Sequence, residues 1–176
     1  MDFLNEPVLP ANLPRVEEVP LTPLERDYRK VLRLEWAITM LVLLVATAAL
    51  FFFVKRLQQP SWMTTAGGAW LLLAATWLLL MELSFRKKAY AIRDKDVIYR
   101  SGWIIQTIHT CPFNRIQHST VAMGPLERQF GLARLILYTA GSNDADLSIP
   151  GLSESTAKSL KEWITKKIAD EPTGQL

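Results

Sequence analysis

The side chains best suited to chemistry lie between residues 109 and 120. Arg115 and His118 are three positions apart, so along a strand they would project from opposite faces and could not form a catalytic pair. His109 and Cys111 are two positions apart and would share a face. Because these two belong to an apolar run that ends at Pro112, we expect packing roles for both. We expect a structural or half-exposed role for His118.

Other reactive groups lack the partners that known chemistries require. Ser119 and Thr120 have no evident base or acid partner for nucleophilic catalysis. Asp144 and Asp146 could bind a divalent cation only within a fuller cage of oxygen ligands. Two histidines and one cysteine are too few for the usual four-ligand zinc site, and no glycine-rich phosphate loop is present. The sequence therefore predicts no catalytic residue, no metal, no cofactor and no enzyme. Activity on a lipid or envelope substrate is the least favoured alternative.

Two arginines and one basic run keep a binding role open. Arg115 and Arg128 could form internal ion pairs, or they could contact carboxylates of a partner or phosphates of a lipid. The run Arg86, Lys87 and Lys88 directly follows an apolar segment. Beside an anionic leaflet, such a run gains roughly 1 kcal/mol per charge.

The elements that position these groups begin with two uncharged apolar runs, residues 36–54 and 62–81. Each has about the 20 residues that a helix needs to cross a hydrocarbon core of roughly 30 Å. The short connector 55–61 predicts an antiparallel hairpin. Neither run carries an ionisable side chain, which argues against an ion path. The first run begins too far into the chain and is too long for a secretory signal.

Basic residues are more numerous at the two ends of the hairpin than in its connector. The connector holds only Lys55 and Arg56, whereas the flanks hold Arg26, Arg29, Lys30, Arg33 and the run 86–88. This asymmetry places both chain termini in the cytoplasm. Small residues in both runs suit close helix packing. They are Ala46, Ala48 and Ala49 in the first run and Gly67, Gly68 and Ala69 in the second. The packing could be within the hairpin, which we favour, or between the two chains of a dimer.

The segment before the hairpin divides into two parts. Residues 1–21 interleave prolines with glutamates and are expected to form a flexible leader. Thr22, Pro23 and Glu25 then match a helix start, with the threonine as N-cap and the proline at the first helical position. We expect this helix to continue into the first span, so that residues 22–84 form the hairpin.

Residues 85–170 predict one β-rich module, followed by a short tail at 171–176. Short runs of β-forming residues separated by turn residues indicate an antiparallel sandwich or barrel; the expected strands are 89–93, 97–100, 103–111, 116–123, 132–139 and 147–149. Pro125 begins a helical turn that ends at Gly131 and closes one end of the sheet with Leu126 and Phe130. Residues 140–144 form a polar loop. Ser153 is the expected N-cap of a helix over 154–169 whose apolar stripe is Ala157, Leu160, Ile164 and Ile168.

A set of short motifs in this module resembles a known family of bacterial membrane proteins, the YdbS-like type. The motifs are Arg115-Ile116-Gln117-His118, Gly124-Pro125-Leu126, Arg128, Phe130-Gly131, Thr139-Ala140-Gly141 and Gly151-Leu152. The resemblance covers roughly residues 30–170. It implies a pleckstrin-homology-like (PH-like) domain, with two nearly orthogonal sheets closed at one end by a helix, in the bacterial inner membrane. It also implies a protein partner, possibly a larger relative that repeats the domain. It does not imply phosphoinositide binding.

The resulting hypothesis is a non-enzymatic, membrane-anchored cytoplasmic PH-like module that acts as a protein-interaction or assembly subunit. The alternative is a module that responds to anionic lipid through Arg115 and Arg128, helped by the run 86–88. A homo-oligomer is compatible with both hypotheses. A net charge of +3 without a basic stripe argues against nucleic acid as a partner.

Overall fold

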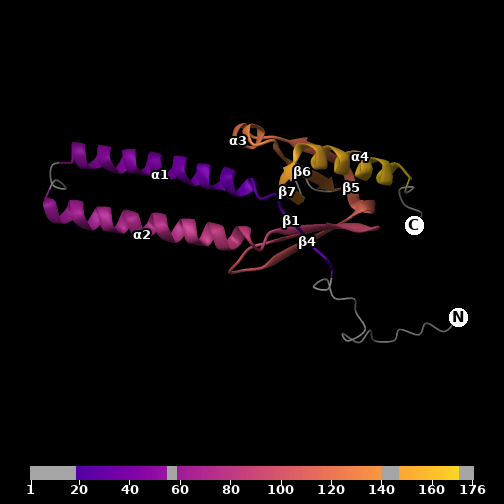
Figure 1. Cartoon of the computed structure of the whole chain (residues 1–176), viewed down its shortest axis with the longest axis horizontal. Helices are drawn as coiled ribbons and strands as arrows, with labels where there is room; N and C mark the ends of the chain where they lie inside the picture. The colour runs from indigo at the N-terminus through magenta and orange to yellow at the C-terminus, as the bar shows by residue number, and fades with distance from the viewer. Residues whose placement is uncertain (1–18, 55–58, 140–146, 171–176) are drawn as a thin grey trace, which may run out of the picture.

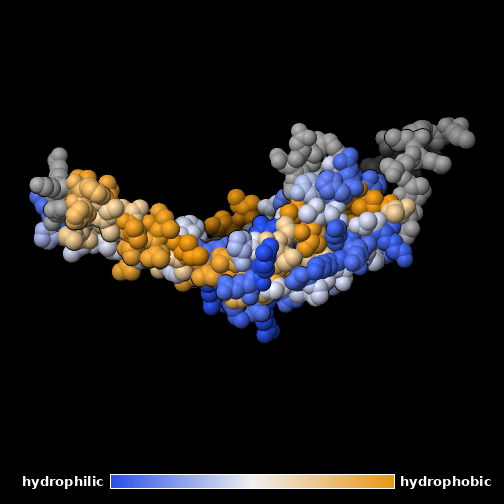
Figure 2. Space-filling view, turned by 90° about the horizontal axis from the view of Figure 1, so that it is seen from above, coloured by the Kyte–Doolittle hydropathy of each residue, from blue (hydrophilic) through white to orange (hydrophobic). Residues whose placement is uncertain are grey.

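The computed structural model describes residues 19–54, 59–139 and 147–170. Most of the leader and of the connector, the polar loop with Asp144 and Asp146, and the tail lie outside these ranges. Two long helices run side by side away from a β-rich module that carries a further helix on its surface (Figure 1). The surface of the long helices is largely apolar, and the hydrophilic surface is concentrated on the module, where it alternates with hydrophobic areas (Figure 2).

The two long helices are α1, Tyr28–Phe53, and α2, Pro60–Phe85. Each has 26 residues, and both are long and apolar enough to cross a membrane. Only 6% and 11% of their most apolar windows are buried. A core helix of a soluble protein would instead be covered by its neighbours. The predicted spans 36–54 and 62–81 coincide with these helices, apart from Val54, which caps α1.

The segment before α1 belongs to the sheet and not to the helix. Thr22–Pro23 form the short strand β1, which pairs antiparallel with β2, Ala89–Ile92. The predicted helix start, with Thr22 as N-cap, is therefore wrong, because pairing with a distant strand prevails over the local capping pattern. The hairpin is thus inserted between two neighbouring strands, and both of its ends lie against one module.

The module consists of two antiparallel sheets, which confirms the predicted fold class. The first has the order β1-β2-β3-β4 and the second β5-β6-β7. The remaining strands are β3 Asp96–Ser101, β4 Thr107–Pro112, β5 Ile116–Ala122, β6 Leu132–Thr139 and β7 Leu147–Ser153. The helical segments are the 3-10 turn η4 Phe113–Arg115, α3 Pro125–Gln129 and α4 Glu154–Asp170.

Two strands differ from their predicted bounds by more than one residue at one end. The strand predicted over 103–111 begins only at Thr107, because residues 102–106 form the turn between β3 and β4. Gly102 adopts a φ of +90°, and a Cβ there would lie 2.0 Å from the carbonyl oxygen of Ile105. Strand β7 continues through Gly151 to Ser153 instead of ending at Ile149.

Helix α4 closes the core as predicted. Ala157 and Ile164 are fully buried, and Leu160 and Ile168 pack at the edge of the core. The hydroxyl of Ser153 accepts a hydrogen bond of 3.1 Å from the amide of Thr156, so the predicted N-cap is confirmed. Leu126 and Phe130 of α3 also pack against the core, as predicted.

The antiparallel strands give the module two distinct ends. We call the end from which α1 and α2 leave the proximal end, and the opposite end the distal end. Ala89 pairs with Arg100, so the α2–β2 junction and the β3–β4 turn share the proximal end. The amide of Phe113 donates to the carbonyl of Lys95 over 3.0 Å, so η4 and the β2–β3 turn share the distal end.

Candidate functional site

The base of the hairpin is held by an ion-pair cluster. The carboxylate of Glu82 on α2 lies 3.1 Å from Arg29 and 3.1 Å from Arg33, both on α1. The guanidinium of Arg29 also lies 4.8 Å from the ring centroid of Phe85. Sequence reasoning missed this cluster, although an acid one position beyond the predicted span, opposite two arginines four residues apart, was a usable signal.

The first turn of α1 is built into the module. The ring of Tyr28 lies against Gly151 of β7, and a Cβ added to that glycine would approach the ring to 2.5 Å. Just before the helix, the amide of Glu25 donates to the carbonyl of Gly151 over 3.0 Å. The ammonium of Lys88 lies 5.8 Å from the Tyr28 ring centroid. The hairpin and the module therefore share one packed junction.

A buried carboxylate stabilises α3 beside this junction. Glu127 is almost fully buried and accepts hydrogen bonds from the amide of Gly124, at 2.7 Å, and from the guanidinium of Arg134, at 2.7 and 3.1 Å. This pairing raises the pKa of Arg134. The sequence signal was the acid three residues after the helix N-cap. Since Gly124 and Arg134, the hydrogen-bond partners of Glu127, both belong to the module itself, we assign Glu127 a structural role.

The structure separates the basic residues that sequence analysis grouped together. Arg86 and Lys87 are exposed at the proximal end, whereas Lys88 is partly buried there, which lowers its pKa. Arg128 is exposed on α3, which lies on the side of the module facing α1 (Figure 1). Arg115 is exposed in η4 at the distal end.

No salt bridge joins Arg115 or Arg128 to another described residue, so the internal-ion-pair interpretation stays a prediction. The charge of Arg128 makes a small contribution to lowering the pKa of Glu154, which is lowered mainly by its hydrogen bond to Lys158. Within the described part of the chain, both arginines are exposed.

The residues of the 109–120 segment have separate surroundings. His118 is exposed and stacks on its cross-strand partner Tyr138, with ring centroids 4.3 Å apart. Cys111 is buried as expected, but His109, two residues earlier on β4, is exposed, so a packing role for His109 is wrong. His109 and Arg115 line a distal hollow of about 200 Å³. Within the described residues, no group of three His, Cys, Asp or Glu side chains could hold a metal.

Residues 30–168 match the family model described as Bacterial PH domain. The chain belongs to this family. It is also similar to the UPF0699 transmembrane protein YdbS of Bacillus subtilis (strain 168), with 26% identity over 160 residues that cover 89% of this chain and 99% of the relative. The resemblance to YdbS-like proteins is thereby confirmed, and the chain is a membrane protein.

Among solved structures, the chain is similar to a DUF1696 family protein with a pleckstrin-homology domain from Shewanella loihica PV-4. The match covers 47% of this chain and 68% of that chain, with 23% identity and a TM-score of 0.34. The PH-like assignment of the module rests on the family match and on its own two sheets and closing helix.

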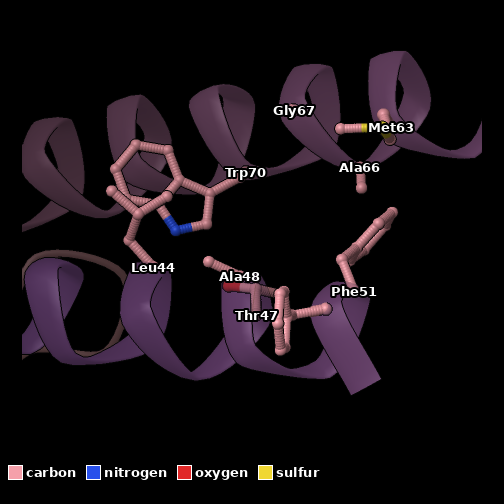
Figure 3. A pocket seen from close by; sticks show the side chains of 9 residues that line it. Leu44, Thr47, Ala48, Phe51, Met63, Ala66, Gly67 and Trp70 are labelled. Carbon is pink, nitrogen blue, oxygen red and sulfur yellow. The ribbon is translucent and has the colours of Figure 1, made fainter. Parts of the chain in front are cut away.

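In this bacterial PH domain protein, the membrane hairpin leaves an apolar groove between its helices. Thr47, Ala48 and Phe51 of α1 face Ala66, Gly67 and Trp70 of α2 across a volume of about 520 Å³ (Figure 3). A Cβ added to Gly67 or to Gly68 would meet no atom within 4 Å. The predicted close packing of these glycines within the hairpin is therefore wrong.

Proposed function

We propose that the protein is a non-enzymatic assembly subunit of the bacterial inner membrane. Its hairpin crosses the bilayer twice, both termini and the PH-like module face the cytoplasm, and a second membrane protein packs a helix into the groove between α1 and α2. A larger relative that repeats the PH-like domain is the kind of partner we expect. The excess of basic residues on the hairpin flanks supports this orientation.

The open groove carries this proposal. Helices in a bilayer associate through close van der Waals packing of small residues. Here the small residues Ala48, Ala66 and Gly67 line a space that the hairpin itself does not fill. Toward the module the helices come together, since Met40 and Ala74 are buried. An additional helix would supply the packing that the outer half of the hairpin lacks.

The junction at the base of the hairpin would couple such a partner to the module. Leu24, Tyr28 and Val31 belong to the same buried cluster as the strands. A partner bound in the groove would therefore hold the PH-like domain at a set orientation. The distal end, with the exposed Arg115, would face away from the membrane toward cytoplasmic carboxylates of the partner.

The test is capture of a partner from native membranes. The tagged full-length chain is solubilised in mild detergent, and the captured proteins are identified by mass spectrometry with a native mass. We expect a stoichiometric second membrane protein. Gly67→Leu, which fills the groove, should greatly reduce its capture. Gly68→Leu is the matched control, because this neighbouring glycine is equally open but does not line the groove. Equal capture by both variants, or capture of no membrane protein, would refute the proposal.

A second candidate function is a response to anionic lipid. The exposed Arg86, Lys87 and Arg128 favour it, because all three lie on the side of the module nearest the hairpin. Arg115 lies at the other end, so a flat membrane would not meet it together with these residues. Reconstitution into bilayers with and without anionic lipid would test this function. It would be excluded if hydrogen exchange in the module were identical in the two bilayers.

A further inference from the structure

The turn between β3 and β4 exposes a run of large apolar side chains. Trp103 is 44% exposed, Ile104 77% and Ile105 78%. Ile108, at the start of β4, is 40% exposed. Such a contiguous apolar patch on the surface of the module indicates a surface that is covered in the native setting.

The turn holds these side chains at its tip. Gly102 has a φ of +90°, which allows the chain to reverse tightly. A Cβ at this position would collide with the carbonyl oxygen of Ile105 at 2.0 Å. The backbone at Gly102 therefore lies close to the backbone at Ile105, and the side chains of Ile104 and Ile105 are exposed.

The turn points toward the membrane end of the molecule. Arg100, next to the turn, pairs with Ala89, and its guanidinium donates to the carbonyl of Lys87 over 3.3 Å. Ala89 follows the last residue of α2, Phe85, by only four positions. Beyond Arg100, the β3–β4 hairpin extends past the start of β2, toward the long helices. Figure 1 shows the tip of the β3–β4 hairpin below the module end of α2, pointing in the same direction as the two long helices.

The depth of the turn follows from simple lengths. If residues 62–81 fill the hydrocarbon core, Arg86 lies about 7 Å outside it, at about 1.5 Å rise per residue, among the headgroups. The turn reaches two or three residues beyond Arg100, or roughly 7–10 Å at about 3.3 Å per residue. Arg100 lies level with Ala89, three residues past Arg86, so Ile104 and Ile105 reach back to about the level of Arg86, among the headgroups next to the acyl chains.

The neighbouring charges suit an anionic leaflet. Arg86 and Lys87 are exposed beside the turn, and Arg100 is half-exposed next to it. Trp103 provides an indole of the kind that concentrates in the interface. An apolar tip with flanking cations is the composition of a segment that lies in a membrane surface.

We propose that the tip of the β3–β4 hairpin, Trp103-Ile104-Ile105, inserts into the anionic leaflet adjacent to the module. The tip is a third membrane contact beside α1 and α2, and it sets the tilt of the PH-like domain against the bilayer. It needs no protein in the groove, so it stands independently of the proposed assembly role.

The test measures the depth of the tip in the full-length chain. Single cysteines are introduced as Ile104→Cys and Ile105→Cys in a Cys111→Ala background, labelled with the fluorophore NBD, and reconstituted into nanodiscs of phosphatidylethanolamine and phosphatidylglycerol. Thr110→Cys is the matched control, because Thr110 is exposed on β4, the strand that follows the turn, at a greater distance from the tip. Doxyl groups on the lipid acyl chains act as the quencher in the membrane, and iodide acts as the quencher in water.

If the tip inserts, NBD emission at positions 104 and 105 should shift to shorter wavelength. The emission should be quenched by the doxyl lipids and protected from quenching by iodide. The control at 110 should show the reverse. Emission at 104 and 105 that is quenched by iodide as strongly as at 110 would overturn the proposal. Protection from both quenchers would also overturn it, since the tip would then be covered by protein.

Discussion

The ring of Tyr28 occupies the space that a side chain at residue 151 would need. Gly151 has a φ of +66°, and its added Cβ would lie 2.5 Å from the ring. The contact joins the first turn of the apolar helix α1 to strand β7 of the module. A helix long and apolar enough to cross a membrane and a strand of the PH-like sheet are therefore parts of one packing unit.

We expect Gly151→Ala to lower the free energy of unfolding by about 2–4 kcal/mol, because the left-handed backbone and the collision with Tyr28 both oppose it. Thermal unfolding of the full-length chain in detergent measures this. Gly131→Ala is the control, since Gly131 has a φ of +64° but no atom within 4 Å of its added Cβ. The control should cost about 1–2 kcal/mol. Equal losses would mean that the contact with Tyr28 is unimportant.

The buried carboxylate of Glu127 should be needed for stability. Glu127→Gln leaves Arg134 without its counterion, and we expect a loss of about 2–3 kcal/mol, less than for a fully buried pair because Arg134 is 40% exposed. The same substitution at Glu154, whose partner Lys158 is well exposed, should change the unfolding temperature little. Similar melting of the two variants would contradict this assignment.

Alkaline pH should unfold the module partly through Tyr99. Burial raises the pKa of this phenol from 10.0 to about 12. Its contribution to stability is therefore complete below pH 10 and is lost as the pH rises through about 12, because the unfolded chain ionises first. We expect Tyr99→Phe to flatten the loss of stability over that range in a pH series of thermal melts. An unchanged slope would show that other groups control alkaline unfolding.

Neutralising Glu82 should loosen the base of the hairpin. We expect Glu82→Gln to cost about 1 kcal/mol, since both arginine partners are substantially exposed. In this variant, the distribution of distances between spin labels on α1 and α2, measured by electron paramagnetic resonance, should broaden. Glu35→Gln is the control, because Glu35 is exposed on α1 and is not part of this cluster. Unchanged distances in the Glu82 variant would refute a clamping role.

Sequence reasoning performed best where a local pattern determines the structure. The two apolar helices follow from the length of uncharged sequence, and the start of α4 follows from the capping side chain of Ser153. The succession of strands β2 to β7 along the chain follows from alternating runs of β-forming residues and turn residues. The closing position of Leu126 and Phe130 also follows from their helical spacing.

It performed worst where residues distant in sequence meet. Thr22 and Pro23 match a helix start, but they pair with Tyr90 and Ala89 across the whole hairpin. Gly67 suggested close packing of the two long helices. A glycine pattern, however, does not say which helix packs against the glycine. Arg115 and Arg128 were grouped by their similar chemistry, and only the course of the strands shows that η4 and α3 lie at different ends of the module.

The position of the hairpin between β1 and β2 has a consequence for biogenesis. The ribosome completes β1 before either span, and its partner Ala89–Ile92 emerges only after both spans have been synthesised. The first sheet can close only if the two flanks of the hairpin emerge on the same face of the bilayer. A chain that inserts one span and leaves the other behind would keep β1 unpaired and Gly151 without Tyr28. Closure of the first sheet therefore requires β1 and β2, which flank the hairpin, to meet on one side of it.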